Sequence, residues 1–229
     1  MDYNYQNWYR TILPNRPLNC YVIPNFTKIQ TREKIDNKIS DWNKETRTIK
    51  LLFSRRFFDI RGVRIMIELS ERLIERYGSK IEITFAGEGP RMNEVFQLSN
   101  KYSNIFITAY EPENSIDFHS LYDIALIPSI GSEGTSLSLL EAMSAGCYCI
   151  ASQVGGLTNI IIDGFNGMLL RAHVDDWFTG ISNLIENTES SEITRQIING
   201  YNVVSEAFSL ERWEYAWEDI LNKMKENDS

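Results

Sequence analysis

The stretch IALIPSIGSEGTSLSLLEAMSAGCYCIAS, residues 124–152, decides the fold. It begins with an apolar run, passes through a loop of small residues into an apolar segment of helical length, and ends in a second apolar run. Short apolar runs joined by a helix are typical of a βαβ unit, in which the two strands are parallel and the helix crosses over one face of the sheet. This stretch therefore predicts a parallel α/β sheet.

The same alternation runs from residue 49 to the C-terminus and predicts an α/β, Rossmann-like parallel sheet of about six strands with helices on both faces. The expected strands are 49–53, 81–86, 105–108, 124–128, 147–152 and 167–170. The expected helices are 63–77, 90–101, 115–122, 135–145, 173–186, 190–206 and 210–225. Residues 24–48 are dense in charge and poor in aliphatic side chains, so we expect either a linker or a loosely packed helix there.

Composition limits the class of protein. The chain has 229 residues, 43% of them hydrophobic, so it can bury a substantial core as one domain. Its net charge of -8 argues against a nucleic-acid-binding surface, which needs a basic excess. No segment approaches the roughly 20 apolar residues of a membrane span, and the start, MDYNYQNWYR, lacks the apolar core of a signal peptide. We expect a cytoplasmic protein, with peripheral association at the inner face of a membrane left open.

The cysteines and histidines give no metal-site pattern. Cys20, Cys147 and Cys149 are an odd number, and a C-x-C pair alone cannot enclose a metal, so the latter two are expected to be buried thiols in a reducing compartment. His119 and His173 are isolated, and each is expected to be a surface or helix residue rather than a ligand or base. No Ser–His–Asp arrangement is apparent.

An arginine cluster follows the first expected strand. The segment SRRFFDIRG, residues 54–62, places Arg55, Arg56 and Arg61 between that strand and the next helix. Ligands of an open α/β sheet bind at the carboxyl ends of its strands, and guanidinium groups hold phosphate oxygens by charge-assisted hydrogen bonds. The cluster indicates an anionic ligand, but a solvated turn that pairs with Asp59 is an equal alternative at this point.

Two glycine turns follow other strands. GEGP, residues 87–90, follows the second expected strand, and Gly155 and Gly156 follow the fifth. Such turns allow a backbone to approach a ligand closely, although plain turns give the same pattern. Neither is the G-x-G-x-x-G fingerprint of dinucleotide-binding proteins.

The loop at 131–136 and its helix carry the strongest signal. Small residues leave the first amides of the helix free to bind phosphate. Between residues 134 and 170 the only charged side chains are Glu141 and Asp163, where the chain average of 24% charged residues predicts roughly nine. The segment is therefore expected to be mostly interior, with Glu141 facing a ligand; its carboxylate can accept hydrogen bonds from two vicinal hydroxyls of a ribose. The alternative is that Glu141 reaches water along a narrow polar stripe.

In this order and spacing, GEGP, PSIGSEGTSLSLLEAMSAG and GGLTNIIIDGFNG resemble the nucleotide-sugar-binding half of retaining glycosyltransferases of family 4, which have the GT-B architecture of two Rossmann-like domains. The most specific element is the pair of glutamates separated by seven residues, Glu133 and Glu141. The resemblance implies that residues 18–229 form a donor-binding domain, one half of a GT-B architecture. Residues 1–17 would be an N-terminal extension or a remnant of the interdomain segment.

The resemblance also implies roles for individual residues. Arg56 and Arg61 match the Arg and Lys that bind the donor diphosphate, and Glu133 matches the glutamate beside the donor sugar. Glu141 matches the glutamate that holds the ribose hydroxyls. The remaining residues assigned to donor binding are Gly134, Thr135, Ser136, Leu137 and Ser138 at the helix start, Gly87, Glu88 and Tyr110 around the base, and Arg55. These enzymes need no metal or other cofactor, only a nucleotide-sugar donor such as a UDP- or GDP-sugar.

Four positions depart from the family pattern. Arg55 stands where the family usually has Gly, so the loop there is expected to differ, and Arg61 replaces a Lys. Tyr110 stands where a Gly is common near the base, and Asn159 often corresponds to a Glu. The motif pair is intact in spite of these changes.

The other Rossmann-like domain of the family, which binds a glycan or lipid-linked acceptor, would precede residue 18. The chain is therefore expected to be a donor-binding half that needs an N-terminal acceptor domain or a separate subunit for catalysis. Trp213 and Trp217 share a helical stripe and are taken as core, either on their own sheet or against that other domain. One alternative is a non-catalytic nucleotide-sugar-binding or regulatory subunit. Another is a doubly wound epimerase or dehydrogenase, against which the missing G-x-G-x-x-G argues.

Overall fold

The computed structural model describes residues 3–14, 20–40, 42, 47–131 and 133–227. All six strands are parallel and form one sheet in the order β3-β2-β1-β4-β5-β6. Their bounds are β1 (Ile49–Ser54), β2 (Ile81–Ala86), β3 (Ile105–Thr108), β4 (Ile124–Ile127), β5 (Tyr148–Ser152) and β6 (Met168–Leu170). The order reverses between β1 and β4, which lie side by side, and this is where doubly wound sheets bind ligands. The predicted six-stranded Rossmann-like fold is confirmed.

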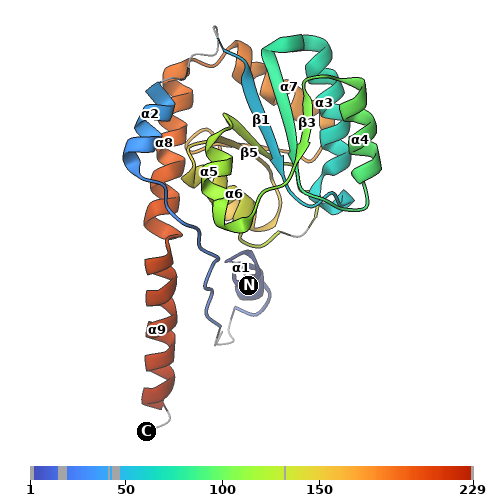
Figure 1. The fold of residues 1–229 in the computed structure, drawn as a ribbon. Coiled ribbons are helices and arrows are strands. Elements are labelled where there is room, and N and C mark those ends of the chain that lie inside the picture. The colour runs from blue at the N-terminus through green and yellow to red at the C-terminus, as the bar shows by residue number, and fades with distance from the viewer. Residues whose placement is uncertain (1–2, 15–19, 41, 43–46, 132, 228–229) are drawn as a thin grey trace.

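Helices cover both faces of the sheet (Figure 1). One layer consists of α3 (Val63–Tyr77), α4 (Met92–Lys101) and α7 (Val174–Glu186), and the other of α5 (Ser115–Ser120), α6 (Leu137–Ser144) and α8 (Ser190–Ala207). Successive strand side chains enter different cores, as the pleat requires. In β5, Ile150 packs with Trp177 of α7, whereas Cys149 and Ala151 pack with Leu139 of α6.

The cysteine prediction is confirmed for the pair around β5. Cys147 and Cys149 are buried and form no disulfide, and burial raises the pKa of both thiols. His119 lies in α5, as a helix residue, and is also buried.

The charged segment 24–48 contains a packed helix, so of the two alternatives the helix is the better one. It is α2 (Arg32–Ser40), in which Ile35 is 1% exposed. Lys38 of α2 donates a hydrogen bond to the carbonyl oxygen of Ala145 at 2.9 Å, which ties the helix to the end of α6.

The helices at the two ends of the chain differ from expectation. α1 (Tyr3–Ile12) has no buried residue and lies near the carboxyl edge of the sheet, although no helix is predicted there (Figure 1). α9 (Leu210–Asn227) forms as predicted but extends away from the sheet (Figure 1). The predicted domain boundary between residues 17 and 18 lies outside the described residues.

The interpretation of Trp213 and Trp217 as core on their own sheet is wrong. Trp217 is 43% exposed, and Trp213 packs on Phe26, with 5.0 Å between the ring centroids. A 3,4 spacing predicts an amphipathic helix but does not say which surface covers its apolar stripe.

Candidate functional site

A cavity of about 870 Å³ lies at the carboxyl ends of β1, β2, β3 and β4. Every residue predicted for donor binding lines it except Gly134. Those residues are Arg55, Arg56, Arg61, Gly87, Glu88, Tyr110, Glu133, Thr135, Ser136, Leu137, Ser138 and Glu141. They come from four separate segments of the sequence, which the parallel topology gathers because the strands that precede them all end at the same edge.

Glu133 is the centre of a buried ion-pair cluster. Its carboxylate is 6% exposed and accepts hydrogen bonds from the guanidinium groups of Arg55 and Arg61. The hydroxyl of Ser129, directly after β4, donates a third at 3.0 Å. A carboxylate buried to this degree requires such partners, because an unpaired charge is costly to remove from water.

The turn after β5 holds the backbone of Glu133. The amide of Gly156 donates to the carbonyl oxygen of Glu133 at 2.7 Å, and a Cβ on Gly155 would lie 2.3 Å from that oxygen. Gly155 also has a φ of +51°, a conformation that favours glycine. Glycine is therefore required at these two positions because the backbone of residues 133–134 approaches them closely, and not because a ligand does.

The three arginines occupy different environments. Arg55 has a side chain only 7% exposed and donates to the hydroxyls of Ser136 at 3.2 Å and Ser138 at 3.3 Å. Arg56 also lines the cavity but is exposed, with its guanidinium over the ring of Phe58. Burial, together with the charges of Arg61 and Arg56, lowers the pKa of Arg55 to about 9, so it remains protonated at neutral pH. The diphosphate role predicted for Arg56 stays a prediction.

The N-terminus of α6 faces this cluster. The first amide to bond within the helix is that of Leu140, which donates to the carbonyl oxygen of Ser136. Ser136 is the N-cap residue but makes no side-chain cap hydrogen bond, and Leu137 and Ser138 line the cavity. The unbonded amides of a first helical turn carry partial positive charge, so this end of the cavity is electropositive.

Glu141 lies within α6 and lines the cavity while being partly buried. Burial raises the pKa of its carboxyl, and a hydrogen bond from the Ser115 side chain opposes that rise. Glu141 therefore lines the cavity, and its contact with a ligand stays a prediction.

Tyr110 and Gly87 also line the cavity. The Tyr110 hydroxyl lies 2.6 Å from that of Ser54, and its ring stacks on Phe118 with 4.3 Å between centroids. Gly87 lines the cavity, and a Cβ on it would lie 2.3 Å from the carbonyl oxygen of Arg55. The GEGP turn is thus needed for two loops to pack, and it also places backbone on the cavity.

The residues of this region that sequence reasoning missed include Ser54, Ser129 and Asn25. Ser54 ends β1 and Ser129 follows β4, so their place at strand ends was an available signal. Asn25 lines the cavity and donates to the carbonyl oxygen of Thr135 at 2.9 Å. Nothing in the charged segment that contains Asn25 indicates that contact.

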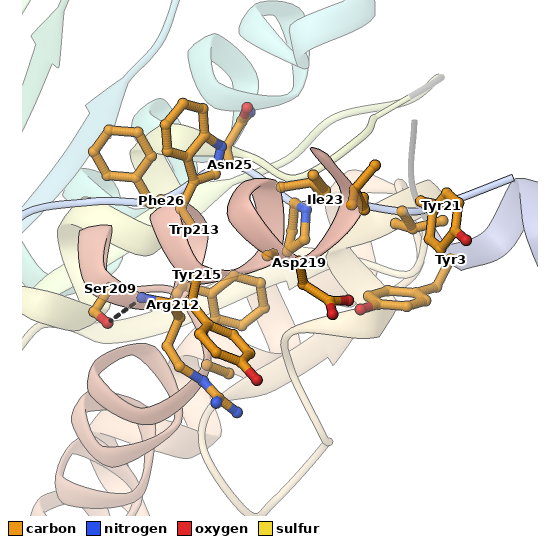
Figure 2. Close-up of a pocket in the computed structure, with 16 residues that line it drawn as sticks. Tyr3, Tyr21, Ile23, Asn25, Phe26, Ser209, Arg212, Trp213, Tyr215 and Asp219 are labelled. Atoms are coloured by element: carbon orange, nitrogen blue, oxygen red, sulfur yellow. Dashed lines mark hydrogen bonds between the residues drawn. The ribbon is translucent and has the colours of Figure 1, made fainter. Parts of the chain in front are cut away.

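A second cavity, of about 360 Å³, lies between residues 21–26 and α9 (Figure 2). Figure 2 shows Phe26 and Trp213 at one end and Tyr3 and Tyr21 near Asp219 at the other. No residue predicted for donor binding lines it.

The described ranges contain no group of three or more His, Cys, Asp or Glu side chains placed to hold a metal ion. None of their helices combines the length and the apolar character that a membrane crossing requires.

Several solved structures share this fold. The chain is similar to sucrose-phosphate synthase from Thermosynechococcus elongatus, with a TM-score of 0.78 and 17% identity over 98% of this chain and 57% of that one. It is also similar to the Anabaena protein HepE in complex with UDP, with a TM-score of 0.69 and 16% identity over 89% and 57% of the two chains. At these identities the comparison shows the fold alone, and this chain covers 57% of each of the two solved chains.

The model of the family "Glycosyl transferases group 1" matches residues 34–202, and the chain belongs to this family. It is 30% identical to an uncharacterized glycosyltransferase of Methanocaldococcus jannaschii over 193 residues, which are 82% of this chain and 48% of the relative. It is 22% identical to the lipopolysaccharide 1,2-N-acetylglucosaminetransferase of Salmonella typhimurium, over 90% and 55% of the two chains. The chain thus spans about half the length of these relatives. Family membership favours a transferase over the epimerase or dehydrogenase alternative.

Proposed function

We propose that the cavity at the sheet edge binds a nucleoside diphosphate sugar and that the chain is the donor-binding half of a retaining glycosyltransferase of family 4. One observation carries the proposal. The guanidinium groups of Arg55 and Arg61 meet at the carboxylate of Glu133, just before α6. A second carboxylate, that of Glu141, lies within α6 and lines the same cavity. A nucleotide sugar has the matching parts, a diphosphate anion and a ribose with two vicinal hydroxyls.

Different residues would bind different parts of the donor. Arg55, Arg61 and the first amides of α6 would hold the diphosphate, and Glu141 would accept hydrogen bonds from the ribose. Glu133 would lie beside the sugar, and Tyr110 and the GEGP turn would form the base pocket.

The reaction breaks the bond between the anomeric carbon and the β-phosphate oxygen, and the electron pair stays on the diphosphate. Arg55 and Arg61 would stabilise the charge that develops there, which lowers the barrier because these groups are held against the diphosphate once the donor is bound. The oxygen of an acceptor hydroxyl forms the new bond to the anomeric carbon, and its proton passes to an oxygen of the departing diphosphate. No metal ion is needed in this scheme.

The acceptor is expected to come from elsewhere. Because the chain spans about half of its relatives, we propose that an N-terminal acceptor domain or a separate subunit binds the glycan or lipid-linked acceptor. The buried, unpaired thiols Cys147 and Cys149 favour a cytoplasmic site of action, since such thiols persist in reducing compartments.

A thermal-shift screen with UDP, GDP, dTDP and ADP tests the binding step. UDP is the first probe because similar solved structures were determined in complex with UDP. We expect one nucleotide to raise the unfolding temperature and the others to have smaller effects. If none of them raises it, the donor-binding proposal is wrong.

A donor-hydrolysis assay separates an enzyme from the alternative, a non-catalytic binding or regulatory subunit. The assay compares the chain alone with the chain plus its candidate acceptor-binding partner. Hydrolysis or transfer that depends on Arg61 supports the enzyme; donor binding without turnover in either sample supports the subunit.

A further inference from the structure

In the structure, the side chains proposed to bind the diphosphate, Arg55 and Arg61, are bonded to a carboxylate. Both oxygens of Glu133 are engaged: Oε1 accepts from Arg55 and Ser129, and Oε2 accepts from Arg61. Glu133 therefore binds one nitrogen of each guanidinium, Nη2 of Arg55 and Nη1 of Arg61, and a phosphate would compete for these donors.

Arg55 is the less expected member of this cluster, since the family resemblance places a glycine there. Its guanidinium lies at the start of α6, bonded to the hydroxyls of Ser136 and Ser138. Its Nε is buried and has no hydrogen-bond partner among the described residues. Arg55 thus reaches the helix N-terminus at which a phosphate group would be held, and its Nε–H is available to donate.

The cluster has an excess of positive charge. Two guanidinium groups share one carboxylate, and the three side chains are 7%, 23% and 6% exposed for Arg55, Arg61 and Glu133. The free amides of α6 add further positive potential at the same place. Positive charge without a counter-charge is costly in a partly buried site. A bound anion would supply the missing counter-charge and so stabilise the cluster.

We propose that diphosphate binding proceeds by exchange: Arg55 and Arg61 release the carboxylate of Glu133 and bind phosphate oxygens instead. Glu133 is then free to accept hydrogen bonds from the donor sugar. Arg55 is a diphosphate ligand in this scheme, and Glu133 is an internal competitor of the diphosphate until the donor arrives. This inference rests on the proposed function, because it concerns the same cavity and the same donor.

Titration calorimetry with UDP and uridine tests the exchange, because uridine has the base and ribose but no phosphate. For Glu133→Gln, we expect UDP to bind about tenfold more tightly than to the wild type, the change that corresponds to removing one charge-assisted competitor. For Arg55→Met, we expect UDP to bind about tenfold more weakly. Uridine should bind equally to all three proteins.

A matched control accounts for the general loss of negative charge. Glu111→Gln removes one carboxylate from an exposed position directly after Tyr110, beside the cavity. We expect it to change UDP affinity by less than about twofold, since exposed charges are screened by water and salt. An effect of Glu111→Gln equal to that of Glu133→Gln would overturn the exchange.

The remaining outcomes separate this inference from the proposed function. If the wild type binds none of the four nucleotides, the proposed function fails. If the wild type binds UDP but Glu133→Gln binds it equally or more weakly, or Arg55→Met binds it equally or more tightly, only the exchange fails. If Glu133→Gln does not fold, a crystal structure of the wild type with UDP decides: the exchange requires Arg55 on a phosphate oxygen, and an intact Arg55–Glu133 ion pair would overturn it.

Discussion

Replacing Glu141 with Gln is expected to stabilise the free domain while weakening nucleotide binding. Burial raises the pKa of the Glu141 carboxyl, so its ionised form destabilises the folded state at neutral pH, and wild-type stability rises as the pH falls through that pKa. The neutral amide removes this effect, with a gain of about 1 kcal/mol or less in the free energy of unfolding at pH 7. For a domain of this size that corresponds to at most about 2–4 °C.

The effect on UDP has the opposite sign. A charged acceptor contributes about 1 kcal/mol more than a neutral one for each of the two ribose hydrogen bonds, so the affinity of Glu141→Gln should fall roughly 30-fold. At a UDP concentration of 100 times the wild-type Kd, binding stabilises the wild type by about 2.7 kcal/mol. The variant would be stabilised by about 0.9 kcal/mol, or one third as much.

The assay is thermal unfolding with and without UDP at pH 7, with Glu111→Gln as the exposed control. The wild type and the control should show the same UDP-induced rise in Tm, and Glu141→Gln should show about one third of it. A full UDP-induced shift in Glu141→Gln would refute the ribose assignment. A lower Tm of the free variant would refute the argument from burial.

Three further predictions concern stability. Trp177→Ala removes a fully buried ring and should cost about 3–5 kcal/mol in urea unfolding; a loss below about 1 kcal/mol would show that the core is not packed as described. Gly155→Ala places a Cβ 2.3 Å from the carbonyl oxygen of Glu133 at a positive φ and should cost more than about 1 kcal/mol in the same assay; an unchanged midpoint would contradict the close approach. Burial lowers the pKa of His119 from 6.5 to about 4, so protonation favours the unfolded state and about 3 kcal/mol of stability is lost as the pH falls from about 6.5 to about 4. His119→Gln should lose that part of the pH dependence, and a profile identical to the wild type would count against it.

The strands and most helices could be predicted because their buried positions recur along the sequence as a periodic pattern of apolar residues. The run 147–152 is apolar at every position except its last because β5 is covered on both faces, and the strand is found at Tyr148–Ser152. α9 was also predicted, but not its surroundings: the spacing of Trp213 and Trp217 reports an apolar stripe and says nothing of the surface that covers it. α1 has no buried residue, so burial imposes no such pattern on its sequence.

The sequence could predict which residues line the cavity, but not which of their side chains contact one another. Residues after parallel strands meet at one edge, so Arg61, Glu133 and Glu141 were expected in one cavity, and they line one. Which of two neighbouring arginines turns inward depends on the backbone of a single loop. The structure buries Arg55 and leaves Arg56 exposed, and nothing in the order of the two residues distinguishes them.

A crystal structure of the domain soaked with UDP is the most direct measurement of the central claim, that the cavity at the sheet edge is the donor site. We expect the diphosphate at the start of α6 within hydrogen-bond distance of Arg55 and Arg61, and the ribose hydroxyls on Glu141. UDP bound instead in the cavity between residues 21–26 and α9, with Glu141 free of any contact, would contradict it.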